Sequence, residues 1–333
     1  MNDEDRFRRR RAIEMRTPRD NRFQPHTPLG PGAEFDSIRR MLERWGPYAR
    51  RIGDDAAVIT SLGERSLIAS TDTSIENVHF RSEWLSPSEI GYRAAASALS
   101  DLAAMGAKPL GMLVAMGIPE HWRSQMDAIS DGIGDAARAV DAPVLGGDMS
   151  RSGELALTIT VLGTGRDVLF RTAARPGDHI YVTGRLGGPG AALRALTEHR
   201  EPSAGDRERF ARPVPRIREA LWLAEKGATS AIDISDGLSS DLCHIAVASR
   251  VAMKIDLAAI PLVDGVTAED AAQSGEEYEI VVTSPVEIDI EEFDRRFNLD
   301  LTRIGSVERG DIGVGFFQDG SRIEVPRGYL HFE

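Results

Sequence analysis

Residues 86–106 read SPSEIGYRAAASALSDLAAMG, and this stretch predicts the long helix around which the fold is built. Ser86, followed three residues later by Glu89, is the pattern of a capping box, and Gly106 is expected to end the helix. Alanine and leucine fill most positions between these ends. Asp101 interrupts the apolar stretch, where a carboxylate is costly unless it is paired or bound to a metal. The stretch therefore predicts a helix that carries a candidate metal ligand.

The patterns on both sides of this helix predict a mixed fold. Helical spacing predicts helices over 35–45, 124–140 and 237–249, and the glycine-rich residues 184–190 are expected to lead into another. Apolar, β-branched runs predict strands over 56–60, 66–70, 110–116, 155–162, 179–183 and 231–234. The pattern restarts between residues 165 and 178, which predicts two domains, over 35–168 and 169–333. Because strands and helices do not alternate strictly, the expected fold class is α+β.

Residues 1–34 differ in composition from the rest of the chain. A series of arginines there precedes Pro25, Pro28 and Pro31. This composition is typical of a mobile arm that cannot bury a core of its own. The simpler interpretation is a solvated extension without a binding role. The functional alternative is a tail that binds an anion or a partner.

The composition of the 333-residue chain bounds its function class. With 40 basic and 52 acidic residues the net charge is −12, which argues against a general nucleic-acid binder. The lone Cys243 excludes an intrachain disulfide framework and a zinc site built from cysteines, and a buried thiol is expected there. Apolar runs fall far short of the roughly 20 residues of a membrane helix, and the N-terminus is polar, so a cytoplasmic protein without a membrane partner is expected.

Nucleotide binding through a P-loop is excluded by the lysines. Lys108, Lys226 and Lys254 are the only three, and they precede Pro, Gly and Ile, whereas a P-loop needs Gly-Lys followed by Ser or Thr. Any nucleotide must therefore be held in another way.

Aspartates recur at the predicted element boundaries. Besides Asp101 in its helix, they lie before a strand, at the end of a strand, after a glycine pair and around Ser235 at a strand-to-helix junction: Asp54-Asp55, Asp72, Asp148, Asp233 and Asp236. Any one of these boundary aspartates, taken alone, is explained by an ordinary role in a turn or as a helix N-cap. Together, with glycines whose N–H groups can approach phosphate and a helix N-terminus that favours anions, they suit Mg²⁺ held jointly by carboxylates and substrate phosphates. The sequence thus predicts a Mg²⁺-dependent phosphate site without a P-loop.

The same segments resemble the thiamine-monophosphate kinase family of the aminoimidazole-ribonucleotide-synthetase-like superfamily. The similarity runs from about Phe35 to the end of the chain and leaves the arm outside. The matching strings are IGDDAAV (52–58), STDT (70–73) with NVHF (77–80), LSDLAAMGA (99–107), GGD (146–148), Arg171 with ARPGD (174–178), VTG (182–184) and IDISDGL (232–238). The SDLAAMGA and DxSDGL strings in this order are specific, whereas GGD alone would be weak.

The resemblance implies a fold and a reaction. The fold would have two α/β domains, the first pairing with its twin in a homodimer with a barrel-like core. The reaction would transfer the γ-phosphoryl group of ATP directly to thiamine monophosphate, giving thiamine diphosphate. Because the acceptor is a phosphate monoester, already anionic near pH 7, no general base and no catalytic side chain is required; clustered Mg²⁺ ions and Arg171 would screen the repulsion between the two polyanions.

The resemblance also assigns residues. The implied metal ligands are Asp55, Ser70, Thr71, Asp72, Asp101, Asp148, Asp233 and Asp236, with Ser70 contributing through its backbone. The implied ATP contacts are Gly147, Asp148, Arg171 and Ser235, and the implied acceptor contacts are His79, Glu276 and Tyr329. Two alternatives stay open: His79 as a packing residue at a strand end, and Arg171 as a surface ion-pair partner.

Two departures from the family pattern fall on the acceptor side. Where the family carries Gly-Gly-Glu-Asp-Tyr-Glu, this chain has Ser274 in place of the first glycine and Glu277 in place of the aspartate. Where the family has an aromatic residue before Gly-Tyr-x-His-Phe, this chain has Pro326, so Tyr329 would replace that ring or the acceptor would differ.

Each rival interpretation is either another enzyme of the same superfamily or a protein that keeps only the ATP site. A selenophosphate synthetase would need a reactive cysteine near a glycine-rich N-terminal loop, and the hydrogenase-maturation relative ends in a cysteine-bearing tail; this chain has neither. An aminoimidazole-ribonucleotide synthetase fits the motifs less well. A non-catalytic ATP-binding regulator would bind ATP without turnover.

Overall fold

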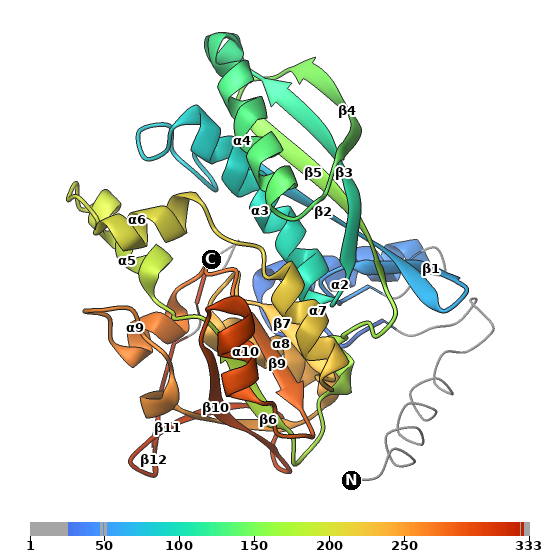
Figure 1. Cartoon of the computed structure of the whole chain (residues 1–333), viewed down its shortest axis with the longest axis vertical. Coiled ribbons are helices and arrows are strands. Elements are labelled where there is room, and N and C mark those ends of the chain that lie inside the picture. Colours follow the sequence, from blue (N-terminus) through green and yellow to red (C-terminus); the bar gives the residue numbers. More distant parts are fainter. Residues whose placement is uncertain (1–25, 47–48, 50–51, 327, 330–333) are drawn as a thin grey trace.

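Two mainly antiparallel β-sheets, with helices packed around them, form the architecture (Figure 1). The computed structural model describes residues 26–46, 49, 52–326 and 328–329. Most strand pairs are antiparallel, and the exceptions are β3 with β4 and β8 with β11. The α+β expectation is therefore confirmed. Among the described residues, no helix combines the length and hydropathy of a membrane-spanning segment.

The first sheet has the strand order β1-β2-β5-β3-β4. Its strands are β1 (Ala57–Leu62), β2 (Arg65–Ile75), β3 (Lys108–Ile118), β4 (Val144–Arg151) and β5 (Ala156–Gly165). Burial alternates along β5, where Leu157, Ile159 and Val161 face the core and are fully buried. The helices α3 (Pro87–Ala104) and α4 (Met126–Ala139), the latter after a 3₁₀ turn at Glu120–Gln125, cover this face. The alternation is that of a sheet with one covered face.

The opposite face of this sheet is more accessible. Thr71 and Thr73 of β2 share hydrogen bonds of 3.0 Å with Thr160 and Thr158 of β5 on that side. Leu113 of β3 is 40% exposed there. The edge strand β4 is exposed at every residue. The single chain thus leaves one sheet face and one sheet edge uncovered.

The second sheet has the order β12-β11-β8-β10-β6-β9-β7. Its strands are β6 (His179–Thr183), β7 (Ser230–Asp233), β8 (Ala252–Asp256), β9 (Ile280–Ser284), β10 (Leu301–Glu308), β11 (Gly313–Gln318) and β12 (Ser321–Ile323). The α-helices of this half are α5 (Gly188–Thr197), α6 (Ala204–Ala211), α7 (Ile217–Glu225), α8 (Leu238–Ser249), α9 (Ala268–Gln273) and α10 (Ile290–Phe297). Short 3₁₀ turns lie at Arg171–Ala173 and Leu257–Ala259. A second apolar cluster, which includes Ile232, Leu242 and Ile255, fixes α8 against this sheet.

Helix α3 lies between the two halves of the molecule. It packs against β2, β5 and α4 on one side and against α6, α7 and β7 on the other. One apolar cluster therefore joins Leu99 of α3 to Trp222 of α7 and Phe293 of α10. The predicted capping box is confirmed, because Ser86 accepts from the Glu89 N–H and Glu89 accepts from the Ser86 N–H at 2.7 Å. Met105 is the C-cap, and Gly106 follows it in a left-handed conformation with φ 59°.

Several predicted boundaries shift. The helix expected over 35–45 is α2, which spans Ala33–Trp45. The prediction that Asp72 ends a strand is wrong: β2 continues to Ile75, because β5 pairs with it in register and sets Asp72 opposite Ile159. The arm over 1–34 lies outside the described residues up to residue 25. Its last part contacts the folded chain, since Thr27 is buried and its N–H donates to the Ile52 carbonyl at 3.0 Å.

Candidate active site

Three carboxylates from separate elements converge between the two sheets. Asp55 precedes β1, Asp101 belongs to α3 and Asp233 ends β7, and one oxygen atom of each lies within 4.8 Å of the others. Serine hydroxyls fix two of them: Ser70 donates to Asp101 at 2.6 Å and Ser100 donates to Asp233 at 2.6 Å. The packing of α3 between the sheets thus produces the convergence that the scattered aspartates predicted.

The shifted pKa values in this aspartate cluster indicate that it needs a bound cation. Burial, together with the charge of Asp233, raises the pKa of Asp101 well above its usual value. Burial and the charge of Asp55 raise the pKa of Asp233 to about 7. Close, buried carboxylates resist full ionisation unless a cation shares the space. Hard oxygen donors at this spacing are the donor set that Mg²⁺ prefers, so the residues fit that metal.

Arg171 is an ion-pair partner of this cluster. Its Nε and Nη2 donate to the two oxygens of Asp55 at 3.1 and 2.6 Å, and Nη1 lies 3.5 Å from the Gly53 carbonyl oxygen. Burial alone would lower the pKa of the Arg171 guanidinium, but the charge of Asp55 raises it overall. Its backbone N–H donates to Asp54 at 2.9 Å. All three guanidinium nitrogens therefore have acceptors within the chain, but the Arg171 side chain is only 15% exposed and that of Asp55 3%, so the ion pair does not lie on the surface.

The β2 residues divide between the two faces of the sheet. Asp72 faces α3 and accepts from the Ser97 hydroxyl at 2.7 Å and from the Thr73 N–H at 2.8 Å. The Thr71 hydroxyl lies on the opposite face, against Thr160. Thr71 can therefore reach a metal on the α3 side only through its backbone. Ser70, expected to act through its backbone, instead presents its hydroxyl to the cluster.

Gly147 and Asp148 lie away from the aspartate cluster. They belong to the exposed edge strand β4, and the ladder runs from Asp72 through Ile159 and Val114 to Gly147. Three strand spacings separate β2 from β4, or about 14 Å. A Cβ at Gly147 would overlap the Val114 carbonyl oxygen, so the close strand pairing itself requires glycine there. Within one chain, the structure does not bring these two residues to the other expected ligands.

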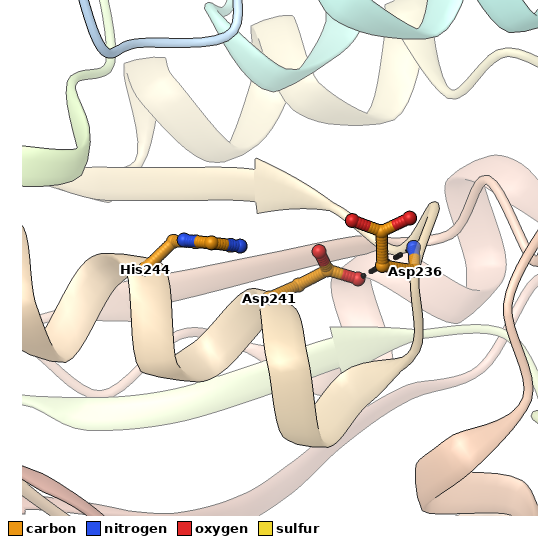
Figure 2. Close-up of side chains that lie close together, drawn as sticks. All are labelled: Asp236, Asp241 and His244. Atoms are coloured by element: carbon orange, nitrogen blue, oxygen red, sulfur yellow. Dashed lines mark hydrogen bonds between the residues drawn. The ribbon is translucent and has the colours of Figure 1, made fainter. Parts of the chain in front are cut away.

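The turn at Ser235 and Asp236 already holds a carboxyl group, which is that of Asp241. This group accepts from the N–H groups of Ser235, Asp236 and Gly237 at 3.1, 3.2 and 3.0 Å. Figure 2 shows Asp241 between Asp236 and His244, and these three side chains form a second group with metal-ligand spacing. Burial and the charge of Asp236 raise the pKa of Asp241 well above its usual value. The sequence analysis missed Asp241, although its place in the first turn of α8 favours a carboxylate.

A cavity of about 750 Å³ opens beside the cluster and is lined from both halves of the chain. Asp72, Asp101, Asp233 and Asp236 contribute to it, as do the expected acceptor residues His79, Glu276 and Tyr329. The Nδ1 atom of His79 accepts from the Ile75 N–H at 3.1 Å, at the end of β2. The Tyr329 side chain is 53% exposed, and its N–H donates to the Asp236 carbonyl at 2.9 Å.

Other cavity residues were not predicted from sequence. Arg93 of α3 is buried, forms an ion pair with Glu276, donates to the Phe210 carbonyl and lies over the Phe210 ring at 4.3 Å. Tyr278 and Trp84 also line the cavity. Pro326 does not; its carbonyl accepts from the Ser239 hydroxyl at 3.0 Å. An arginine within an apolar helix was the one available signal for Arg93, because such a charge requires a partner.

Comparison with known proteins identifies the family. Models of the AIR synthase related protein N-terminal and C-terminal domains match residues 53–165 and 175–317. The thiamine-monophosphate kinase of Escherichia coli (strain K12) is 36% identical over 324 residues, covering 90% of this chain and 98% of that protein. The enzyme of the same name from Pyrococcus horikoshii is 33% identical, covering 90% and 96%.

Solved structures agree with this assignment. AaThiL complexed with AMPPCP and TMP has a TM-score of 0.78 and 31% identity, covering 90% of this chain and 97% of that one. The thiamine-monophosphate kinase from Stenotrophomonas maltophilia K279a has a TM-score of 0.72 and 33% identity, covering 89% and 98%. A HypE–HypF complex, at 20% identity and a TM-score of 0.74, shares the fold. This chain therefore belongs to the thiamine-monophosphate kinase family of AIR synthase related proteins.

Proposed function

We propose that this chain transfers the γ-phosphoryl group of ATP to thiamine monophosphate and produces thiamine diphosphate. The observation that carries the proposal is one cavity that joins the aspartate cluster to His79, Glu276 and Tyr329. A metal-binding carboxylate set beside a separate pocket is the arrangement that direct transfer between two phosphate-bearing substrates needs. The family relationship supports the same reaction.

The metal is proposed to be Mg²⁺, with Asp55, Asp101 and Asp233 as its central ligands. Asp72 and Asp236 line the same cavity and would complete the set, with Ser70 and the Thr71 carbonyl nearby. When bound, Mg²⁺ supplies positive charge that offsets repulsion between donor and acceptor phosphates. The chain's own groups orient these ligands. Arg171 donates to Asp55, and the hydroxyls of Ser70 and Ser100 donate to Asp101 and Asp233, respectively.

The acceptor needs no base from the protein. A phosphate monoester is largely dianionic near pH 7, so it carries a nucleophilic oxygen already. The side chains therefore have to bind and align the substrates, and that accounts for a site rich in carboxylates and hydroxyls. His79, Glu276 and Tyr329 are the proposed acceptor contacts, and Ser235 is a proposed ATP contact.

Pairing of two chains is proposed from the uncovered sheet. The face with Thr71, Thr160 and Leu113 and the edge strand β4 are accessible in the single chain. A second copy packed there would bury them in the expected homodimer with a barrel-like core, and it would give Gly147 and Asp148 of β4 a place near a nucleotide. A cytoplasmic location stays a prediction.

A product assay tests the function. Purified chain, ATP, Mg²⁺ and thiamine monophosphate are incubated, and thiamine diphosphate is quantified by chromatography. Product is expected for the unaltered chain and is expected to fall at least a hundredfold in Asp101→Asn, because a central ligand loses its charge, and also when a chelator removes the metal. Asp131→Asn, on the exposed side of α4, is the matched control and should keep full activity. ATP binding without product would favour the regulator or another acceptor instead.

A further inference from the structure

The segment from Ser274 to Glu279 has two sides with different surroundings. Glu276 and Tyr278 line the cavity, whereas the side chains of Glu277 and Glu279 are buried on the other side. The backbone is tied to the chain that carries Asp233 and Asp236, because the Glu276 N–H donates to the Ser235 carbonyl at 2.7 Å and the Tyr278 N–H to the Ile234 carbonyl at 2.9 Å. The segment thus adjoins the metal side and forms a wall of the acceptor side.

The backbone of this segment is in an unfavourable conformation at both cavity residues. Glu276 has φ 61° and Tyr278 has φ 52°, which is the left-handed region that residues with a Cβ seldom adopt. Such conformations persist where surrounding contacts fix them. Some of these contacts are made by the two residues themselves, through their N–H groups and through the ion pair of Glu276 with Arg93, and the buried residues that alternate with them add others.

Glu277 supplies a group of these contacts, directed at the glycine-rich loop before α5. Its Oε1 accepts from the Gly187 N–H at 2.6 Å and from the Ser274 hydroxyl at 2.6 Å, and its Oε2 lies 3.2 Å from Nη2 of Arg209. The Ser274 oxygen in turn accepts from the Gly190 N–H at 3.0 Å. Gly190 also lines the cavity, so this pair joins two of its walls.

Glu279 shares Arg209 with Glu277, since Nη2 of Arg209 lies 3.5 Å from its Oε1, and it has further partners of its own. It accepts from the Thr183 hydroxyl at 2.6 Å and from Nε and Nη2 of Arg216 at 2.8 and 2.6 Å. These bonds anchor the end of the segment to β6 and to the start of α7. Glu277 is therefore the residue whose contacts lead to the cavity wall, through its hydrogen bond from Ser274.

We propose that Glu277, paired with Ser274, is a positioning residue for the acceptor site. It would hold Glu276 and Tyr278 toward the cavity and fix the glycine-rich loop opposite them, without touching the substrate itself. The inference rests on the proposed function, because it concerns how tightly thiamine monophosphate is bound.

Steady-state kinetics of three variants test the inference. Glu277→Gln replaces the carboxyl group that faces Arg209 with an amide, Ser274→Ala removes the hydroxyl, and the third variant combines both. The KM for thiamine monophosphate is expected to rise about tenfold in each single variant, while kcat and the KM for ATP stay within about threefold. The double variant should be little worse than either single one, because both changes break the same unit.

Glu292→Gln is the matched control. It also removes a carboxylate from an ion pair, with Lys226 at 2.6 Å, but it lies on α10 outside the cavity. It should leave all three kinetic constants unchanged. Thermal unfolding of each variant separates a loss of folded protein, which lowers kcat in proportion, from a change in KM. If Glu277→Gln does not fold, Ser274→Ala and Ser274→Gly carry the same test.

The outcomes are distinguishable. The inference is overturned if the unaltered chain makes thiamine diphosphate and the variants keep its KM, if kcat falls with KM unchanged, or if the two single effects multiply in the double variant. Failure of the unaltered chain to make thiamine diphosphate would instead overturn the proposed function on which the inference rests.

Discussion

A buried carboxyl group that resists ionisation makes stability depend on pH, and Glu277 is such a group. Burial raises its pKa to about 7, although hydrogen bonds from Ser274 and the charge of Arg209 lower it. Because the folded pKa lies above the unfolded value near 4.5, the stabilisation is complete at low pH and is lost as the pH rises from about 4.5 through about 7.

Glu277→Gln removes this dependence. Relative to the variant, the unaltered chain should lose roughly 2–3 kcal/mol of unfolding free energy between pH 5 and pH 8. Urea denaturation at several pH values measures the difference between the two proteins, so that other titrating groups cancel. A difference that stays constant with pH would show that Glu277 ionises normally in the folded chain.

At the scale of elements, the crossing of α3 and α4 depends on two glycines. A Cβ at Gly132 of α4 would overlap the Ser88 carbonyl oxygen of α3, and a Cβ at Gly91 of α3 would overlap the Ile129 carbonyl oxygen of α4. In an open helix, replacing glycine by alanine stabilises by about 1 kcal/mol. Here overpacking against backbone, at about 1–3 kcal/mol, outweighs that gain because the backbone atoms cannot rotate away.

Gly132→Ala is therefore expected to lower the melting temperature. Gly134→Ala is the control on the same helix, where the added carbon meets the flexible end of Arg138 at 3.1 Å, and it should be neutral or stabilising. Thermal unfolding of both variants measures the contrast. Equal shifts in the two would mean that α3 and α4 can move apart at no cost.

The elements also show what sequence can and cannot predict. The capping box at Ser86 and Glu89 was predictable because it depends on residues three apart. Asp101 was predictable as a site residue because a lone carboxylate in an apolar helix needs a partner. The hydrogen bond from the Gly187 N–H to the Glu277 carboxyl group was not, since it joins residues ninety positions apart in sequence. The continuation of β2 past Asp72 was missed for the same reason, because β5 extends it.

At the scale of the whole molecule, the uncovered sheet predicts association. Light scattering should show a dimer for the unaltered chain. Leu113→Arg, on the uncovered face, should shift it toward the monomer, because a charge would be buried in the interface without a partner. Ile312→Arg, at a position 51% exposed next to β11, is the control and should leave the dimer intact. If light scattering shows that the unaltered chain is itself a monomer, the proposed dimer is contradicted.

The position of α3 between the two halves also affects how the protein unfolds. The apolar cluster that contains Leu99 continues past α3 to Trp222 and Phe293 of the second half, whereas the second cluster, around α8, lies wholly within that half. Removing either half would remove the elements that pack against one side of α3 and would expose the first apolar cluster to water. We therefore expect the two halves recognised as distinct sequence families to unfold together, because the first cluster extends across the boundary between them.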